Sequence, residues 1–135
     1  MGKIYTGRIA NRGSDRLDTT VKSGAGLGKL LAPTWDLVGG AKRHETQSRD
    51  PRWLRYTPLT REQYTEGYYA LLRERYKADA DAAPFIELIQ RERLVICCYC
   101  AADTFCHRYM AVDILMKIAA AHGLPCEWGG ELPIG

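Results

Sequence analysis

Hydrophobic positions alternate near the start of the chain and follow a helical period further along. Lys3–Ile9 alternates β-branched and aromatic side chains with other residues, which predicts a first strand, and Leu17–Val21 predicts a second, short one. Leu94–Cys100 is apolar at every position, as expected for a strand that is covered on both faces. These three segments predict one sheet.

Helices are predicted mainly in the second half of the chain. Apolar side chains three and four residues apart predict a helix over Arg61–Lys77, and Thr60 with Gln63 fits a capping box at its start. Ala83–Glu92 predicts a shorter helix before the buried strand. After a loop that follows this strand, the apolar face of Cys106–His122 predicts a last helix.

Strands and helices in this order are typical of an α/β domain with a mostly parallel sheet. We expect a single compact domain over residues 1–135, with helices flanking the sheet in a Rossmann-like three-layer arrangement. Ligands of such sheets bind beyond the carboxyl ends of the strands, where loops lead into helix N-termini.

Two segments of the first half carry turn or loop signals. Ser23–Lys29 holds three alternating glycines without the spacing of a phosphate-binding loop, and it predicts a turn that packs closely on a neighbouring segment. Leu30–Val38 is apolar and closes on Gly39 and Gly40. Ala41–Pro58 is polar and has no periodicity, which predicts either a binding loop or lid or a solvated segment without a function.

The composition excludes several classes of protein. A hydrophobic content of 46% is enough for a core, and a net charge of only +3 is too low for binding phosphate backbones by electrostatics alone. No apolar run approaches the ~18 residues that a membrane span needs, and Met1–Ala10 does not resemble a secretory signal. Cys97, Cys98 and Cys100 are crowded into one strand, which favours a reducing cytoplasm over a disulfide framework.

The junction between the buried strand and the last helix gathers reactive side chains. Cys100 is the last residue of the strand, and the helix begins with Cys106, His107 and Arg108. The start of a helix is usually exposed, and its unpaired backbone N–H groups and the helix dipole favour negative charge there. We expect the pKa of a thiol there to lie below the free value of ~8.5. His107 is the candidate acid–base group and Arg108 the candidate anion-binding group.

Three other interpretations of these cysteines remain open. Cys97 and Cys98 are expected to be small core residues, because free cysteine is often buried. Zinc is a second interpretation, but the spacing is unusual and adjacent Cys106 and His107 would diverge by ~100° on a helix. A redox pair of Cys100 with Cys106 is the third.

Residues elsewhere are candidates for the same ligand site. Thr6 and Arg8 lie near the carboxyl end of the first strand, although Arg8 fits a solvated edge equally well. Trp35, after Thr34, is suited to stack on a flat ligand such as a base, or else covers the edge of the core. Glu131 approaches the site if the C-terminal tail folds back.

These motifs resemble the DUF488 family, a group of small uncharacterised bacterial and phage proteins. The resemblance is carried by Cys106–Arg108 at the helix start, by the opening Ile4–Arg8 strand and by the closing Gly129–Leu132 segment. The Asp-Val-Arg motif that usually follows an early strand in that family is not evident here. The resemblance implies a compact α/β fold and supplies no established reaction.

Two functions fit the predicted site. In an enzyme, Cys106 or Cys100 is the thiolate nucleophile acting on a small anionic, nucleotide-like substrate. In a non-catalytic binding module, such as a phage-type accessory protein, the same pocket holds such a ligand or nucleic acid without turnover. No metal, cofactor or membrane partner is expected, and no oligomeric state is indicated.

A basic segment of the chain comprises Arg43, Arg49, Arg52 and Arg55 with Trp53 and Tyr56. Its composition resembles a nucleic-acid footprint, and a solvated loop is the alternative interpretation.

Overall fold

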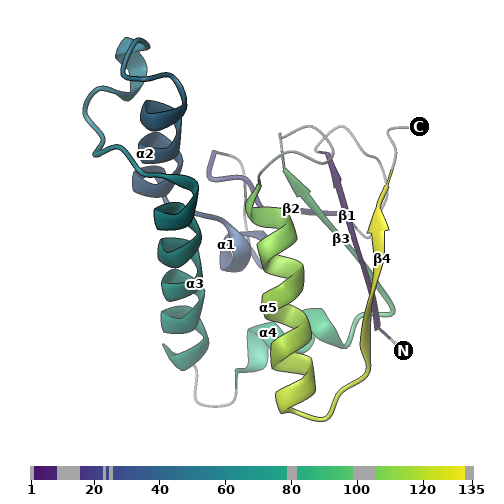
Figure 1. Cartoon of the computed structure of the whole chain (residues 1–135). Helices are drawn as coiled ribbons and strands as arrows, with labels where there is room; N and C mark the ends of the chain where they lie inside the picture. Colours follow the sequence, from purple (N-terminus) through teal and green to yellow (C-terminus); the bar gives the residue numbers. More distant parts are fainter. Residues whose placement is uncertain are drawn as a thin grey trace.

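A computed structural model of the chain describes residues 2–8, 16–22, 24, 26–78, 82–98 and 106–132. The chain forms a four-stranded sheet in the order β2-β3-β1-β4, in which every neighbouring pair is parallel (Figure 1). The strands are β1 (Gly2–Arg8), β2 (Arg16–Asp18), β3 (Arg93–Cys98) and β4 (Cys126–Glu131).

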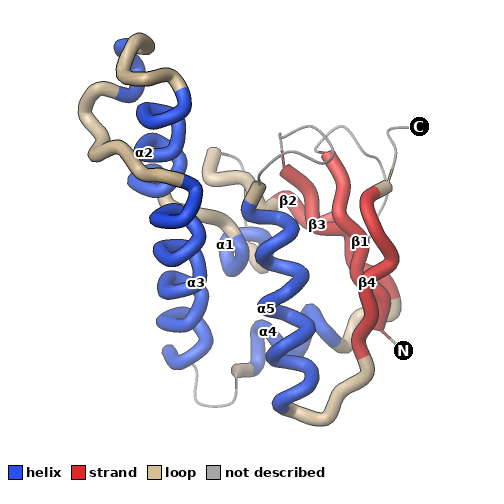
Figure 2. Tube along the Cα trace, in the orientation of Figure 1, coloured by secondary structure: helices blue, strands red, loops and turns tan. Residues whose placement is uncertain are grey.

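The described helices lie on one side of the sheet in Figures 1 and 2, with α5 nearest to the strands and the long α2 and α3 farther out. Their bounds are α1 (Gly28–Leu31), α2 (Trp35–Glu45), the 3-10 turn η1 (Pro51–Trp53), α3 (Arg61–Ala78), α4 (Ala83–Ile89) and α5 (His107–Ala121). The prediction of a single compact α/β domain with a parallel sheet is confirmed, and the layout is consistent with a Rossmann-like arrangement. No helix in the described part of the chain has the length and apolar content that crossing a membrane requires.

One face of the sheet packs on the helices. Ile4 of β1 lies beside Leu94 of β3, and both belong to the same buried cluster as Val112 and Leu115 of α5. Because side chains alternate between the faces of a strand, this face continues toward the carboxyl edge through the neighbouring pair Arg8 and Cys98. The strand order therefore brings Cys98 to the edge where α5 begins.

The capping box predicted at Thr60 is confirmed. The Gln63 backbone N–H donates to Thr60 Oγ1 at 3.1 Å, and the Thr60 N–H donates to Gln63 Oε1 at 2.9 Å. The predicted strands and helices of the second half are present, with α4 ending earlier than predicted, at Ile89. Tyr99 and Cys100 lie outside the described residues.

The prediction that Ala41–Pro58 is a loop throughout is wrong for its first part. Helix α2 continues through Gly39 and Gly40 to Glu45, so these glycines do not end the apolar segment. A Cβ at Gly39 would overlap the ring of Tyr56, so the missing side chain lets the returning chain lie against the helix. The close packing predicted for the glycine-rich turn is also observed, since a Cβ at Gly28 would overlap the backbone of β2.

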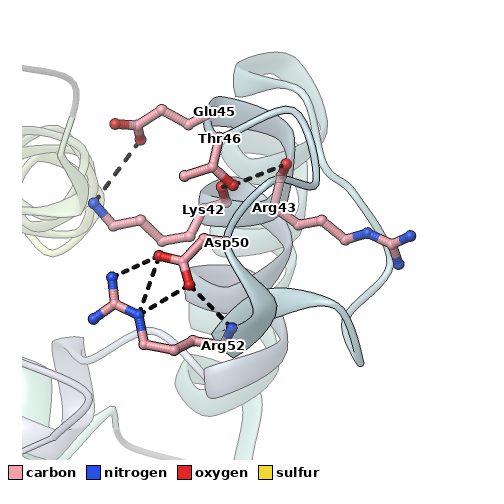
Figure 3. Close-up of polar contacts among 6 residues, drawn as sticks. All are labelled: Lys42, Arg43, Glu45, Thr46, Asp50 and Arg52. Atoms are coloured by element: carbon pink, nitrogen blue, oxygen red, sulfur yellow. Dashed lines mark hydrogen bonds and ion pairs between the residues drawn. The ribbon is translucent and has the colours of Figure 1, made fainter.

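Arginines of this basic segment bind groups within the segment itself. Arg43 Nη1 donates to Leu54 O at 3.1 Å, and Arg52 forms an ion pair with Asp50 at 2.6 Å, drawn in Figure 3. Arg49 Nε donates to a backbone carbonyl of the same segment at 3.2 Å. These contacts fix the turn after α2, and nucleic-acid binding by the segment stays a prediction.

Candidate functional site

Two buried cysteines meet at the carboxyl edge of the sheet. Cys98 ends β3 and Cys106 is the N-cap residue of α5, and their Sγ atoms lie 2.6 Å apart. Cys106 has extended backbone angles, φ −158° and ψ 146°, so its side chain turns toward the strand instead of following the helix. Both side chains are nearly inaccessible, with relative exposures of 2% and 5%.

Arg108 is fully buried beside this sulfur pair. Its Nη1 donates to Cys98 Sγ at 2.8 Å, while Nε and Nη2 donate to the two carboxylate oxygens of Glu131 at 3.1 and 3.0 Å. Nη2 also donates to the Tyr109 hydroxyl at 2.9 Å. Burial alone would lower the pKa of Arg108, but Glu131 and Cys98 outweigh it and raise this pKa. The guanidinium is therefore a permanent cation that favours negative charge on Cys98.

His107 is held by the segment that follows β2. Its Nε2 lies 2.9 Å from the Thr19 carbonyl oxygen and 3.0 Å from Thr19 Oγ1. A carbonyl only accepts, so Nε2 carries a proton, and in the neutral form of the ring Nδ1 then carries the lone pair. Nδ1 lies 3.7 Å from Cys106 Sγ. The chain thus presents a basic nitrogen next to the sulfur pair.

A cavity of about 340 Å³ opens at this point. Its inner end is formed by Cys98, Cys106 and His107, and α2 covers much of its side. Lys22, Lys42 and Trp35 bring amines and an aromatic ring to it. The other lining residues are Thr20, Val21, Pro33, Val38, Ala41, Glu45 and Tyr64.

The structure brings together Cys106, His107 and Arg108 as the sequence predicts. Trp35 lines the cavity and is 45% exposed, whereas Thr34 caps α2 by accepting from the Leu37 N–H at 3.3 Å. Cys100 lies outside the described residues, so its predicted pairing with Cys106 stays a prediction.

Thr6 and Arg8 lie on the face of β1 that carries the site. In register, Thr6 neighbours Glu131 and Arg8 neighbours Cys98. Within the described part of the chain, Thr6 Oγ1 and Arg8 Nε are buried atoms without a hydrogen-bond partner. Glu131 does fold back, as the sequence suggested, and its partner is Arg108.

Two expectations about the site need correction. The start of α5 is buried, because β4 and the segment after β2 cover it through Glu131 and Thr19. The expected divergence of Cys106 from His107 is wrong, because Cys106 caps the helix in an extended conformation. The expected burial of Cys98 is confirmed, and alternation from Leu94 places it on the face of Arg8 that packs against the helices.

Comparisons with known proteins find no family model, curated protein or solved structure that matches this chain. The resemblance to the DUF488 family stays a prediction.

Proposed function

We propose that the cavity at the start of α5 binds a small anionic, nucleotide-like ligand. The observation that supports this most directly is one cavity lined by two lysines, an exposed tryptophan and the buried pair Cys98 and Cys106. Its volume of about 340 Å³ lies within the usual range of small-molecule pockets. A pocket with apolar walls and a few polar groups is the usual form of a ligand site.

The lysines and the tryptophan suit the two parts of such a ligand. Lys42 Nζ lies 3.9 Å from Glu45 in an exposed pair, which contributes little energy and leaves the amine available to an anion (Figure 3). Lys22 supplies a second exposed amine. The ring of Trp35 offers a face to a flat group such as a base. Arg108 does not line the cavity, but it donates a hydrogen bond to the sulfur of Cys98 at its inner end.

Thiol-dependent catalysis is a second candidate, favoured by the hydrogen bond from Arg108 to Cys98. A guanidinium against one of two touching sulfurs favours a thiolate in the pair, and thiolates are the nucleophilic form of cysteine. The imidazole of His107 stands next to Cys106 and is suited to move a proton. The resemblance to the DUF488 family supplies no established reaction that would specify this catalysis.

Ligand titrations test the binding function. Adenosine, guanosine, cytidine and uridine mono- and triphosphates are added to the reduced protein, and heat release and thermal shift are measured. We expect saturable binding by at least one of them, weakened about tenfold or more by Trp35→Ala and by Lys42→Gln, because each removes one recognised part.

Matched controls exist for both substitutions. Trp128 is exposed to a similar extent, 48%, and Lys117 forms a comparable ion pair with Asp113 at 3.0 Å, but neither lines the cavity. Trp128→Ala and Lys117→Gln should leave binding unchanged. Equal losses in all four variants, or no binding of any nucleotide, would contradict the proposal.

The variant Cys106→Ser separates binding from catalysis. In chelator-treated, metal-free protein, a binding module keeps its affinity in this variant, whereas a thiol enzyme keeps its ligand and loses turnover of it. Turnover is followed by mass spectrometry of each ligand that binds.

A further inference from the structure

We infer that Cys98, Cys106 and His107 form a site for a divalent zinc ion at the inner end of the cavity. The sequence predicts no metal, because neighbouring helical residues diverge, and the extended N-cap conformation of Cys106 removes that objection. The inference deepens the proposed function, and rests on it only for the ligand that completes the coordination of the ion.

The three ligand atoms are already close to zinc geometry. The Cys98 and Cys106 sulfurs and a ring nitrogen of His107 all lie within 4.8 Å of one another. In a tetrahedral site with Zn–S about 2.3 Å and Zn–N about 2.0 Å, sulfur and nitrogen lie about 3.6 Å apart. The observed distance from Cys106 Sγ to His107 Nδ1 is 3.7 Å. The sulfurs, now 2.6 Å apart, must separate by about 1 Å to reach this geometry, and the Cys98 sulfur already lies within 4.8 Å of the His107 ligand nitrogen.

The surroundings of His107 match those of a metal-binding imidazole. Such a histidine generally donates its second ring N–H to a carbonyl or carboxylate, which fixes the tautomer that binds the metal. His107 Nε2 lies 2.9 Å from the Thr19 carbonyl, so Nδ1 is the nitrogen with the lone pair, and it faces the sulfurs. Arg108 supports the other side, because its donation to Cys98 Sγ stabilises a thiolate ligand.

Charge and protons balance in this site. Each cysteine loses its thiol proton to solvent as it binds, so one Zn²⁺ replaces two protons and two S–H bonds become two Zn–S bonds. The product, one dication with two thiolates and a neutral imidazole, adds no net charge to the buried site. Arg108 and Glu131 already neutralise each other beside it. No oxidant or reductant is involved.

Two thiolates and one imidazole favour zinc over the hard ions magnesium and calcium, which prefer oxygen ligands. A set of three protein ligands is also the pattern of zinc sites that keep a fourth position for water or substrate. All three residues line the cavity, so the cavity is the source of this fourth ligand. An anionic ligand is the class that such an ion attracts.

Metal binding is tested with zinc and cobalt salts alone. The reduced, chelator-stripped protein is titrated with Zn²⁺ and metal content per chain is measured after desalting, while Co²⁺ reports sulfur ligation through a near-ultraviolet charge-transfer band. We expect about one ion per chain, the release of about two protons per ion, and protection of two thiols from a disulfide reagent. Cys98→Ser and Cys106→Ser should each weaken binding about 100-fold or more, and His107→Ala about tenfold or more.

Cys126→Ser is the matched control, because Cys126 is also a free cysteine but lies at the opposite end of β4. It should retain the stoichiometry and the cobalt spectrum of the unaltered protein. If a site variant does not fold, proton release and thiol protection in the unaltered protein still decide the question.

The inference is overturned if reduced protein binds no zinc, if Cys126→Ser weakens binding as much as Cys98→Ser, or if mass spectrometry finds the Cys98 and Cys106 thiols joined and the metal absent. Zinc binding without nucleotide binding would refute the proposed ligand and leave the metal site standing. Nucleotide binding by protein that binds no zinc would do the reverse.

Discussion

Cys97 and Cys98 are neighbours in β3, and both are buried, yet the two faces of the sheet give them opposite chemical surroundings. The Cys97 thiol donates to the Val95 carbonyl at 3.8 Å, and burial raises its pKa to about 11. Cys98 faces α5, where Arg108 donates to its sulfur at 2.8 Å and a second sulfur touches it. Accessible area alone does not distinguish them.

This difference shows that the position of a compensating charge, rather than burial, separates a packing cysteine from a chemical one. An isolated thiol in a protein interior is held neutral because the anion loses its hydration. Beside a guanidinium that is itself neutralised by a carboxylate, the anion gains a hydrogen bond from a permanent donor. The pair Arg108 and Glu131 therefore defines the functional face of the strand.

Removal of this charge is expected to have the largest effect. Arg108→Met leaves Glu131, whose side chain is 14% exposed, without its buried partner, and should lower the free energy of unfolding by about 3–5 kcal/mol. Arg93→Met is the control on the opposite face. The guanidinium of this exposed arginine lies 4.8 Å from the Tyr5 ring centroid, and its loss should cost less than about 1 kcal/mol.

Urea unfolding monitored by circular dichroism measures both losses. Similar losses in the two variants would show that the functional face has no special dependence on its charge. The double variant Arg108→Met/Glu131→Leu should recover part of the loss, because it leaves no buried charge unpaired.

Most of the fold follows from local signals in the sequence. The capping box at Thr60 and the apolar period of α3 and α5 are properties of short segments, so they were predictable. The continuation of α2 through Gly39 was not, because it depends on contact with Tyr56, which lies farther along the chain. Long-range packing overrode a local helix-ending signal there.

The candidate site was predictable in place but not in detail. The junction between β3 and α5 was identified from residue types alone, since parallel sheets collect function at that edge. The contact of Cys98 with Cys106 depends on the N-cap conformation, and the contact of His107 with Thr19 joins residues 88 positions apart. Neither has a signature in the order of residues.

Alkaline pH should reveal the neutral thiol of Cys97. Its pKa is raised from 9.0 to about 11 in the folded protein, so its contribution to stability is full below about pH 9 and is lost as the pH rises toward 11. This shift in the pKa corresponds to a loss of roughly 2 kcal/mol in the free energy of unfolding, after allowance for relaxation of the structure. Cys97→Ala should therefore show a shallower loss of stability between pH 9 and 11.

Comparison of slopes rather than absolute stabilities removes the packing cost of the substitution. Tyr69, whose pKa burial and its bond to Asp113 raise to about 12, is present in both proteins and affects both slopes alike. Parallel stability curves for the two proteins would mean that Cys97 is not held neutral.

The alkylation rates of cysteines on the two faces of the sheet should differ by about tenfold. This corresponds to a smaller free-energy difference than the preceding predictions. In reduced, metal-free protein at pH 8, iodoacetamide reacts with the thiolate, and Cys98 and Cys106 line the cavity whereas Cys97 is not among its lining residues. Peptide mass spectrometry over time should show these two modified before Cys97. Equal rates at all three positions would indicate that reaction occurs only in the unfolded chain, and the distinction would fail.

The smallest expected effects concern two buried threonines and have opposite signs. Thr19 Oγ1 donates to the Cys97 carbonyl at 2.9 Å and lies 3.0 Å from His107 Nε2, so it joins the two faces, and Thr19→Val should cost about 1–2 kcal/mol. Thr6 is equally buried, but its Oγ1 lacks a hydrogen-bond partner among the described residues, so Thr6→Val should be neutral or stabilise by up to about 1 kcal/mol. Urea unfolding of the two variants measures the difference. If Thr6→Val also weakens nucleotide binding, the hydroxyl serves the ligand, as the sequence predicts. A loss of stability equal to that of Thr19→Val would show that the hydroxyl has a structural partner in solution.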